Sequence, residues 1–184
     1  MEKLKQEIIK YGKKVVKEGL CISFFGNISV RSGNKVYITA TGTILDDLDL
    51  DDIKECKIDS RECKGASSEL KVHQMIYKKN SDIQAVLHTH SFYTLLLNEE
   101  DKERIMKYEF GEFIGDFTIV DGKSGSDELA TRVSDCVNDY GLVIVRDHGV
   151  FSWGNSLKDA YIKISGLEYY SKLEFYKKIS KGFI

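Results

Sequence analysis

The chain has 184 residues, 42% of them hydrophobic and 30% charged, which suits one compact domain, 1–184, with a core of its own. Its 27 Lys and Arg residues are balanced by 29 Asp and Glu residues, so it lacks the concentrated basic field that a nucleic-acid groove needs. The chain starts with an amphipathic pattern and has no run of about 18 apolar residues, so we expect a cytoplasmic protein without a leader or a membrane span.

The first part of the chain predicts one helix and three strands. Residues 3–20 place apolar side chains at helical spacing, and Gly19 ends the pattern as a C-terminal stop would. Segments 27–31 and 35–41 have the pattern of short strands around a polar turn, and 53–58 predicts a third strand.

A second helix and a buried strand are predicted in the middle of the chain. Ser67 and Ser68 offer N-cap hydroxyls to a helix at 69–79, and an apolar strand follows at 83–90. A short helix is expected at 94–97.

The last part of the chain predicts two capped helices and two buried strands. Ser124 with Asp127, and Ser156 with Asp159, have the spacing of a capping box at a helix start. The expected elements are an extended segment at 113–120, a helix from Ser124 to about Asp139, strands at 142–145 and 149–153, and a final helix to about Ile179. Because helices and strands alternate without a regular βαβ repeat, the sequence predicts a three-layer α/β fold with helices on both sides of a central mixed, largely antiparallel sheet.

The four cysteines form no C-x-x-C pair, and nothing in the sequence points to an oxidising compartment. We therefore expect free, mostly buried thiols. The four are Cys21, Cys56, Cys63 and Cys136.

Three of the four histidines lie at predicted strand ends. His88 and His90 are two residues apart, so on a strand both imidazoles face the same side and could bind one ion, although two satisfied surface histidines would give the same pattern. His148 follows another buried strand, and strand ends on one edge of a sheet commonly converge on a site. Three neutral imidazoles leave an open coordination position, a catalytic pattern that favours zinc and also fits cobalt, manganese or iron.

Two further residues lie close to this expected metal site. Glu69 begins a predicted helix and could be a fourth ligand or a general base, or simply stabilise the helix N-terminus. His73 lies four residues later on the same helical face, where a ligand, an orienting or a core role is open; we favour a core or orienting role, because the ligands already suffice.

Small polar residues at strand and helix ends predict a phosphate site. Backbone N–H groups, hydroxyls and a helix dipole can bind a phosphate without a basic residue, although such residues also serve simply to make turns. The candidates are Gly26, Asn27, Thr41, Gly42, Ser67 and Ser68.

Five short motifs follow one another along the chain: Gly26-Asn27-Ile28-Ser29-Val30-Arg31, Ile38-Thr39-Ala40-Thr41-Gly42, Ser67-Ser68-Glu69, His88-Thr89-His90-Ser91 and Asp147-His148-Gly149-Val150. In this order they resemble the motifs of the class II aldolase/adducin family, from the first predicted helix to the last. The resemblance implies the class II aldolase fold.

The family includes sugar-phosphate aldolases such as fuculose-1-phosphate aldolase, sugar-phosphate 4-epimerases, methylthioribulose-1-phosphate dehydratases and the non-catalytic adducin head domain. A binding module has no need of a complete metal-ligand set, so the four candidate ligands argue against an adducin-like role. Epimerases of the family typically carry an aspartate at the position of Glu69. The Ser67-Ser68-Glu69 motif therefore resembles most the motif of the fuculose-1-phosphate aldolases. A dehydratase stays open, because it can carry the same glutamate.

For an aldolase, the resemblance implies one divalent metal per subunit, held by His88, His90, His148 and Glu69. A ketose 1-phosphate would be cleaved to dihydroxyacetone phosphate and an aldehyde through a metal-stabilised enediolate. Glu69 would move the proton at the hydroxyl-bearing carbon, and Tyr108, which resembles the family's proton-donor tyrosine in placement, would serve the aldehyde-derived oxygen.

Two departures concern the aldehyde end of the substrate: Ala40 replaces the usual proline of its motif, and 123–126 replaces a proline-containing loop. Family members with this motif set are typically cyclic homotetramers with shared active sites, so the resemblance implies that Tyr108 acts in a neighbouring subunit. Aromatic residues on the final helix fit such a contact, or packing on the chain's own sheet. They are Tyr161, Tyr169, Tyr170, Phe175 and Tyr176.

Overall fold

The computed structural model describes residues 1–60, 62–138 and 140–182. Within these ranges a seven-stranded sheet runs in the order β3-β2-β1-β4-β7-β6-β5. Its strands are β1 (Asn27–Ser32), β2 (Lys35–Thr39), β3 (Ile53–Lys57), β4 (Ala85–Thr89), β5 (Thr118–Val120), β6 (Leu142–Val145) and β7 (Gly149–Gly154). Neighbouring strands pair antiparallel except β5 and β6, which are parallel. The predicted mixed, largely antiparallel sheet is therefore confirmed.

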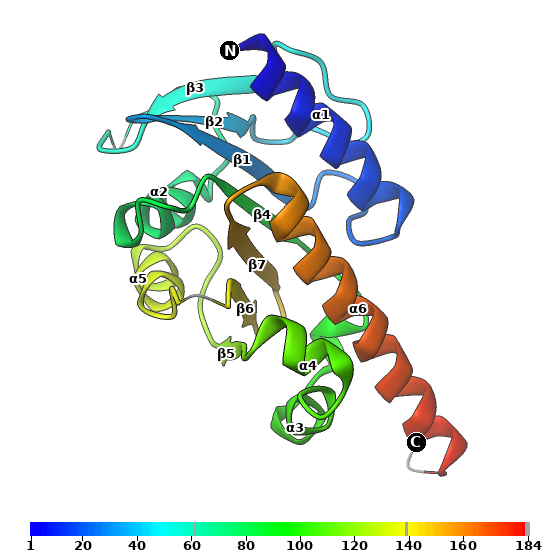
Figure 1. Cartoon of the computed structure of the whole chain (residues 1–184). Helices are drawn as coiled ribbons and strands as arrows, with labels where there is room; N and C mark the ends of the chain where they lie inside the picture. Colours follow the sequence, from blue (N-terminus) through cyan, green and yellow to red (C-terminus); the bar gives the residue numbers. More distant parts are fainter. Residues whose placement is uncertain (61, 139, 183–184) are drawn as a thin grey trace.

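Helices cover both faces of the sheet (Figure 1). They are α1 (Glu2–Lys17), α2 (Leu70–Lys79), the 3-10 helix η1 (Thr94–Leu96), α3 (Glu99–Ile105), α4 (Glu109–Ile114), α5 (Asp127–Asp135) and α6 (Leu157–Ser180). Helices α1 and α6 pack on one face, where α3 and α4 also contact α6, and α2 and α5 pack together on the other. This arrangement gives the three layers that the sequence predicts. None of the helices in the described ranges has both the length and the apolar character needed to cross a membrane.

Alternating side chains of the central strands supply two hydrophobic cores. In β6, Leu142 and Ile144 pack toward α1 and α6, while Val143 and Val145 pack toward α2 and α5. The strands β1, β4 and β7 are each paired on both sides. Side chains at the ends of these strands therefore extend from backbone that is paired with a neighbouring strand on each side.

Segment 113–120 is largely not extended, contrary to the sequence prediction. Its first two residues belong to α4, Gly115 with a φ of 77° caps that helix, and only Thr118–Val120 forms a strand. Helix α3 was not predicted, although Asn98 and Asp101 form a capping box at its start. Both helices are too short to give a clear helical period in the sequence.

Helix α5 begins later than the sequence predicts. Ser126, rather than Ser124, accepts the capping hydrogen bond, from the Leu129 N–H group. The Ser124 hydroxyl instead donates to Glu69. The predicted helix end near Asp139 lies outside the described residues.

The prediction of free cysteines is wrong for one pair. Cys56 on β3 and Cys63 in the following loop form a disulfide, with their Cα atoms 5.5 Å apart. Ala66 forms an antiparallel β-bridge with Ala40 beside the sheet, so the loop between β3 and Ala66 turns back. The two cysteines, seven residues apart in the sequence, are thereby close enough to bond. The other two cysteines carry free thiols.

Candidate active site

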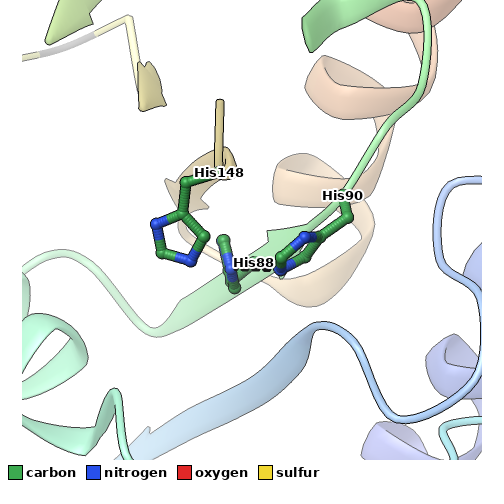
Figure 2. Close-up of side chains that lie close together, drawn as sticks. All are labelled: His88, His90 and His148. Carbon is green, nitrogen blue, oxygen red and sulfur yellow. Dashed lines mark hydrogen bonds between the residues drawn. The ribbon is translucent and has the colours of Figure 1, made fainter. Parts of the chain in front are cut away.

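Three histidine side chains gather at one edge of the sheet (Figure 2). His88 lies in β4 and His90 just beyond its end, while His148 lies in the turn between β6 and β7. The rings point toward one another, and a ligand nitrogen from each lies within 4.8 Å of the other two. The structure thus brings together the three histidines that the sequence pattern singled out.

The tight turn between β6 and β7 carries His148 to this position. Its backbone places Asp147 at a φ of 55°, a left-handed conformation that Asp tolerates better than most residues. Gly149 follows where β7 passes close to β4. An added Cβ there would lie 2.4 Å from the Thr89 carbonyl oxygen and 2.6 Å from His88 Cε1. The Asp-His-Gly sequence therefore matches both the shape of the turn and the close approach of the strands.

Hydrogen bonding fixes the proton on the neutral His88 ring. Nδ1 lies 3.0 Å from the Val150 carbonyl oxygen, which can only accept, so Nδ1 donates and Nε2 carries a lone pair. That Nε2 lies 3.1 Å from His90 Nε2 and 3.1 Å from a Glu69 carboxylate oxygen. Lone pairs and negative charge converge where a cation would satisfy them, and an imidazole held by a carbonyl is the usual arrangement of a zinc-ligating histidine.

Among the described residues, His148 Nδ1 is the buried side-chain polar atom without a hydrogen-bond partner. The donor set and its burial thus fit a divalent metal ion.

Glu69 lies between the imidazoles and the body of helix α2. Although it is the N-cap residue of that helix, its carboxylate is 3.1 Å from His88 Nε2, 3.2 Å from His148 Nε2, and accepts a hydrogen bond of 3.0 Å from Asn27 Nδ2. Burial by itself would raise the pKa of Glu69, but the two imidazoles and the Asn27 amide outweigh it, so the pKa is lowered and the carboxylate is ionised. An ionised carboxylate beside imidazole nitrogens can bind a metal ion or accept a proton.

The His88 and His90 imidazoles are held in the form that binds metals. Burial is the main cause that lowers the pKa of His88, and burial followed by the potential of His88 and His148 lowers the pKa of His90 to about 3. Neutral rings at ordinary pH present lone pairs rather than positive charge.

A cavity of about 420 Å³ opens beside this cluster. All six residues of the predicted phosphate site line it, together with Glu69, His90 and His148. The Thr41 N–H group is already bonded to Gly65 and the Ser67 N–H group to Thr39, so these residues offer their hydroxyls rather than their backbone donors. Ser67 and Ser68 directly precede the N-terminus of α2, where the helix dipole favours an anion.

His73 lies behind the cluster rather than in it. It is fully buried, and its Nε2 is 2.6 Å from Asn27 Oδ1, so the His73 ring is linked to the Glu69 carboxylate through the Asn27 amide. This position agrees with the core or orienting role favoured from the sequence.

Comparison with known proteins places this geometry in a family. The model of the class II aldolase and adducin N-terminal domain matches residues 6–175. The chain belongs to this family. A protein of Methanocaldococcus jannaschii named L-fuculose phosphate aldolase is 38% identical over 172 residues, which cover 92% of this chain and 94% of the relative. A methylthioribulose-1-phosphate dehydratase of Gluconacetobacter diazotrophicus is 27% identical over 181 residues, which cover 89% and 88%.

Solved structures agree with the fold. The crystal structure of L-fuculose-1-phosphate aldolase from Thermus thermophilus has a TM-score of 0.88 at 22% identity, covering 99% of this chain and 97% of that one. The family resemblance predicted from five short motifs is thus confirmed, and so is the class II aldolase fold.

Sequence reasoning missed three residues of this class II aldolase-like site. Ser124 lines the cavity and its hydroxyl donates to Glu69 over 3.3 Å. Phe24 and Phe25 also line the cavity, and the Phe25 ring lies 5.0 Å from the His90 ring. The exposure of Phe24, at 58%, is the kind of signal that only a structure gives. The sequence shows two adjacent aromatic residues, Phe24 and Phe25, before the Gly26-Asn27 motif, but their spacing does not link them to the site.

Tyr108 lies apart from this cluster within the chain. Its hydroxyl contacts Glu174 and Lys177 of α6, and its ring stacks on Tyr170 at a centroid distance of 5.2 Å. The described residues that line the cavity do not include it. Within one chain, the structure does not bring Tyr108 to Glu69.

Proposed function

We propose that this protein is a divalent-metal-dependent aldolase that cleaves a ketose 1-phosphate to dihydroxyacetone phosphate and an aldehyde. The observation that carries the proposal is the cluster of Glu69 and three imidazoles beside one cavity. Glu69, His90 and His148 line this cavity together with hydroxyl and glycine residues. The M. jannaschii relative, which is named an L-fuculose phosphate aldolase, supports this choice within the family.

The metal would be held by His88, His90, His148 and Glu69, and zinc is the ion that this donor set favours. When bound, it supplies Lewis-acid polarisation of the substrate oxygens. The substrate phosphate would bind at the hydroxyls and backbone that precede α2 and follow β2, because the helix dipole and hydroxyl donors favour an anion there. The phosphate-binding residues would be Gly26, Asn27, Thr41, Gly42, Ser67 and Ser68. We expect the enzyme to work in the cytoplasm.

Two proton transfers complete the reaction. In the direction of condensation, the ionised Glu69 takes a proton from the hydroxyl-bearing carbon of dihydroxyacetone phosphate, and Tyr108 protonates the aldehyde oxygen as the carbon–carbon bond forms. Cleavage reverses both transfers. The Asn27 amide and the Ser124 hydroxyl hold the two oxygens of the Glu69 carboxylate in place for this work.

The experiment is to incubate zinc-loaded protein with L-fuculose 1-phosphate and other ketose 1-phosphates, and to measure dihydroxyacetone phosphate separately from epimerised or dehydrated product. Release of dihydroxyacetone phosphate by the wild type, and its loss in a metal-loaded Glu69→Gln variant, is the expected result, because the amide keeps the shape but cannot accept the proton. An epimer or a dehydration product would reassign the enzyme within its family. No product from any substrate would overturn the proposal.

We further propose a homotetramer in which Tyr108 acts in the site of a neighbouring subunit. The position of Tyr108 on the α6 side of the chain, away from its own Glu69, supports this arrangement. Exposed aromatic residues on α6 support it too: Tyr169 is 65% and Tyr176 is 52% exposed, whereas Tyr161 is buried in the chain's own core.

Mixing two inactive variants tests the shared site. Subunits with Tyr108→Phe and subunits with Glu69→Gln, reassembled together, should recover part of the activity, because some sites then combine two intact residues. A monomer by light scattering, or no recovery in assemblies that are shown to be mixed, would return Tyr108 to a structural role.

A further inference from the structure

Four hydrogen bonds lead from Glu69 into the core, alternating between α2 and β1. Asn27 Nδ2 donates to Glu69 Oε2 over 3.0 Å, and Asn27 Oδ1 lies 2.6 Å from His73 Nε2. His73 Nδ1 lies 2.7 Å from Ser29 Oγ, which lies 2.7 Å from the Tyr77 hydroxyl. All five side chains are buried. Burying a series of polar side chains costs free energy unless each of them has its hydrogen-bond partners. In this series each side chain has a partner, which points to a specific role.

The series exists because the spacing of the strand and the spacing of the helix nearly coincide. Asn27 and Ser29 are two residues apart on β1, so they share one face and are separated by about 6.7 Å. Glu69, His73 and Tyr77 are four residues apart at and along α2, so they share one face with a rise of about 6 Å per step. Because these two spacings are similar, side chains from β1 and α2 can alternate along the series.

Every proton in this series has one consistent position. Asn27 Nδ2 donates to Glu69 Oε2, so the Asn27 NH2 group faces Glu69 and the Asn27 carbonyl faces His73. That carbonyl only accepts, so His73 Nε2 carries the proton. In the neutral ring Nδ1 then accepts from the Ser29 hydroxyl, and Ser29 accepts from Tyr77. All four donors point toward Glu69.

We infer that His73 is a positioning residue that holds the Asn27 amide in one orientation and thereby fixes the Glu69 carboxylate against the imidazole cluster. Ser29 and Tyr77 fix the His73 tautomer in turn. The opposite Asn27 orientation would set its carbonyl oxygen against the Glu69 oxygen, and its NH2 group against the protonated Nε2 of His73. This inference rests on the proposed function, in which Glu69 moves a proton.

The proton positions can be tested in the wild-type protein. With only four histidines in the chain, a long-range proton–nitrogen spectrum of 15N-histidine-labelled, zinc-loaded protein resolves each ring, and the spectrum of a His73→Gln variant assigns His73 by its missing signals. We expect a neutral His73 with the proton on Nε2 at pH 7. A ring protonated on Nδ1, or on both nitrogens, would overturn the inference.

Two substitutions at His73 separate positioning from packing. His73→Gln keeps an N–H group that can donate to Asn27, whereas His73→Leu keeps the bulk without a donor. Loss of an orienting partner behind a metal site typically costs about 10–100-fold in affinity or activity. We expect kcat per bound zinc to fall about tenfold or more in His73→Leu with KM within about twofold, and to stay within about threefold of wild type in His73→Gln.

Equal kcat values in the two folded variants would mean that His73 only fills space, and would overturn the inference. Should His73→Leu not fold, His73→Met is the second donor-free variant. The zinc affinity, measured by chelator competition, should be about tenfold weaker in the donor-free variant than in His73→Gln. A wild type without aldolase activity would sink the proposed function alone, because the tautomer and the zinc affinities still decide whether His73 positions Glu69.

Discussion

Replacing His73 with Gln should make the metal-free protein less sensitive to acid. The His73 ring is fully buried, and burial lowers its pKa from 6.5 to about 3 in the folded chain. In the unfolded chain the ring titrates near its ordinary value of 6.5. Between these two values the unfolded state binds a proton that the native state does not, so the free energy of unfolding falls as the pH falls.

The size of this effect follows from the linkage relation. Stability is unaffected by His73 well above pH 6.5 and is lost below it at up to about 1.36 kcal/mol per pH unit, until the folded ring itself protonates near pH 3. Because the unfolded ring is already half protonated at pH 6.5, the loss between pH 6.5 and 4.5 amounts to roughly 2 kcal/mol. A glutamine at the same position does not titrate.

Urea unfolding of both proteins at pH 6.5 and 4.5, with a chelator present, measures this difference. The other histidines and the carboxylates titrate in both proteins, so their contributions cancel when the two losses are compared. The wild type should lose roughly 2 kcal/mol more than His73→Gln over this range. Equal losses would refute the reasoning, because they would mean that His73 takes up its proton in the folded protein.

Three more perturbations follow from the site and the loop beside it. His148→Ala should weaken zinc binding by about 100-fold or more in chelator competition, and unchanged affinity would remove His148 from the site. Gly149→Ala should destabilise the protein by about 1–3 kcal/mol and weaken zinc binding, because its Cβ would press on His88 and the backbone of β4; a neutral result in thermal unfolding and zinc titration would contradict the close approach. Cys63→Ser should lower the free energy of unfolding by about 2.5 kcal/mol in urea titrations, the loop-closure value for a seven-residue separation, unless thiol counting finds Cys56 already free in the wild type.

The histidine cluster of the candidate metal site was predictable because its residues come in short motifs at the ends of buried strands. His88 and His90 share a face because side chains on a strand alternate with a period of two residues. The turn that holds His148 is predicted by the residues on either side of it: an Asp that can adopt a positive φ, and a Gly where β7 passes close to β4. The sheet follows from the same apolar runs. Local patterns of this kind predict structure without knowledge of which distant segments come into contact.

Contacts between distant segments could not be predicted in the same way. Ser124 has the spacing of a capping residue, yet it faces Glu69, 55 residues earlier, because Ser126 caps α5 instead. The Cys56–Cys63 disulfide depends on a loop that turns back beside the sheet, which no cysteine spacing announced. The contact between Tyr108 and α6 could not be predicted for the same reason. Tyr108 is the N-cap residue of α4, and α4 is too short to be predicted from the periodicity of the sequence.

The arrangement of the strands also explains why relatives named for an aldolase and for a dehydratase can share this fold. The candidate site gathers where β1 begins, β4 ends and β7 begins, and each of these central strands is paired on both sides. That base fixes the imidazole cluster and the start of α2. The residues that reach across the cavity come from elsewhere: Phe24 and Phe25 lie in the loop before β1, and Ser124 lies in the loop before α5. Loops can change without disturbing the paired strands, so the choice of substrate and reaction can vary while the cluster is kept. Substitutions in these loops should therefore alter which sugar phosphate is accepted before they alter metal binding.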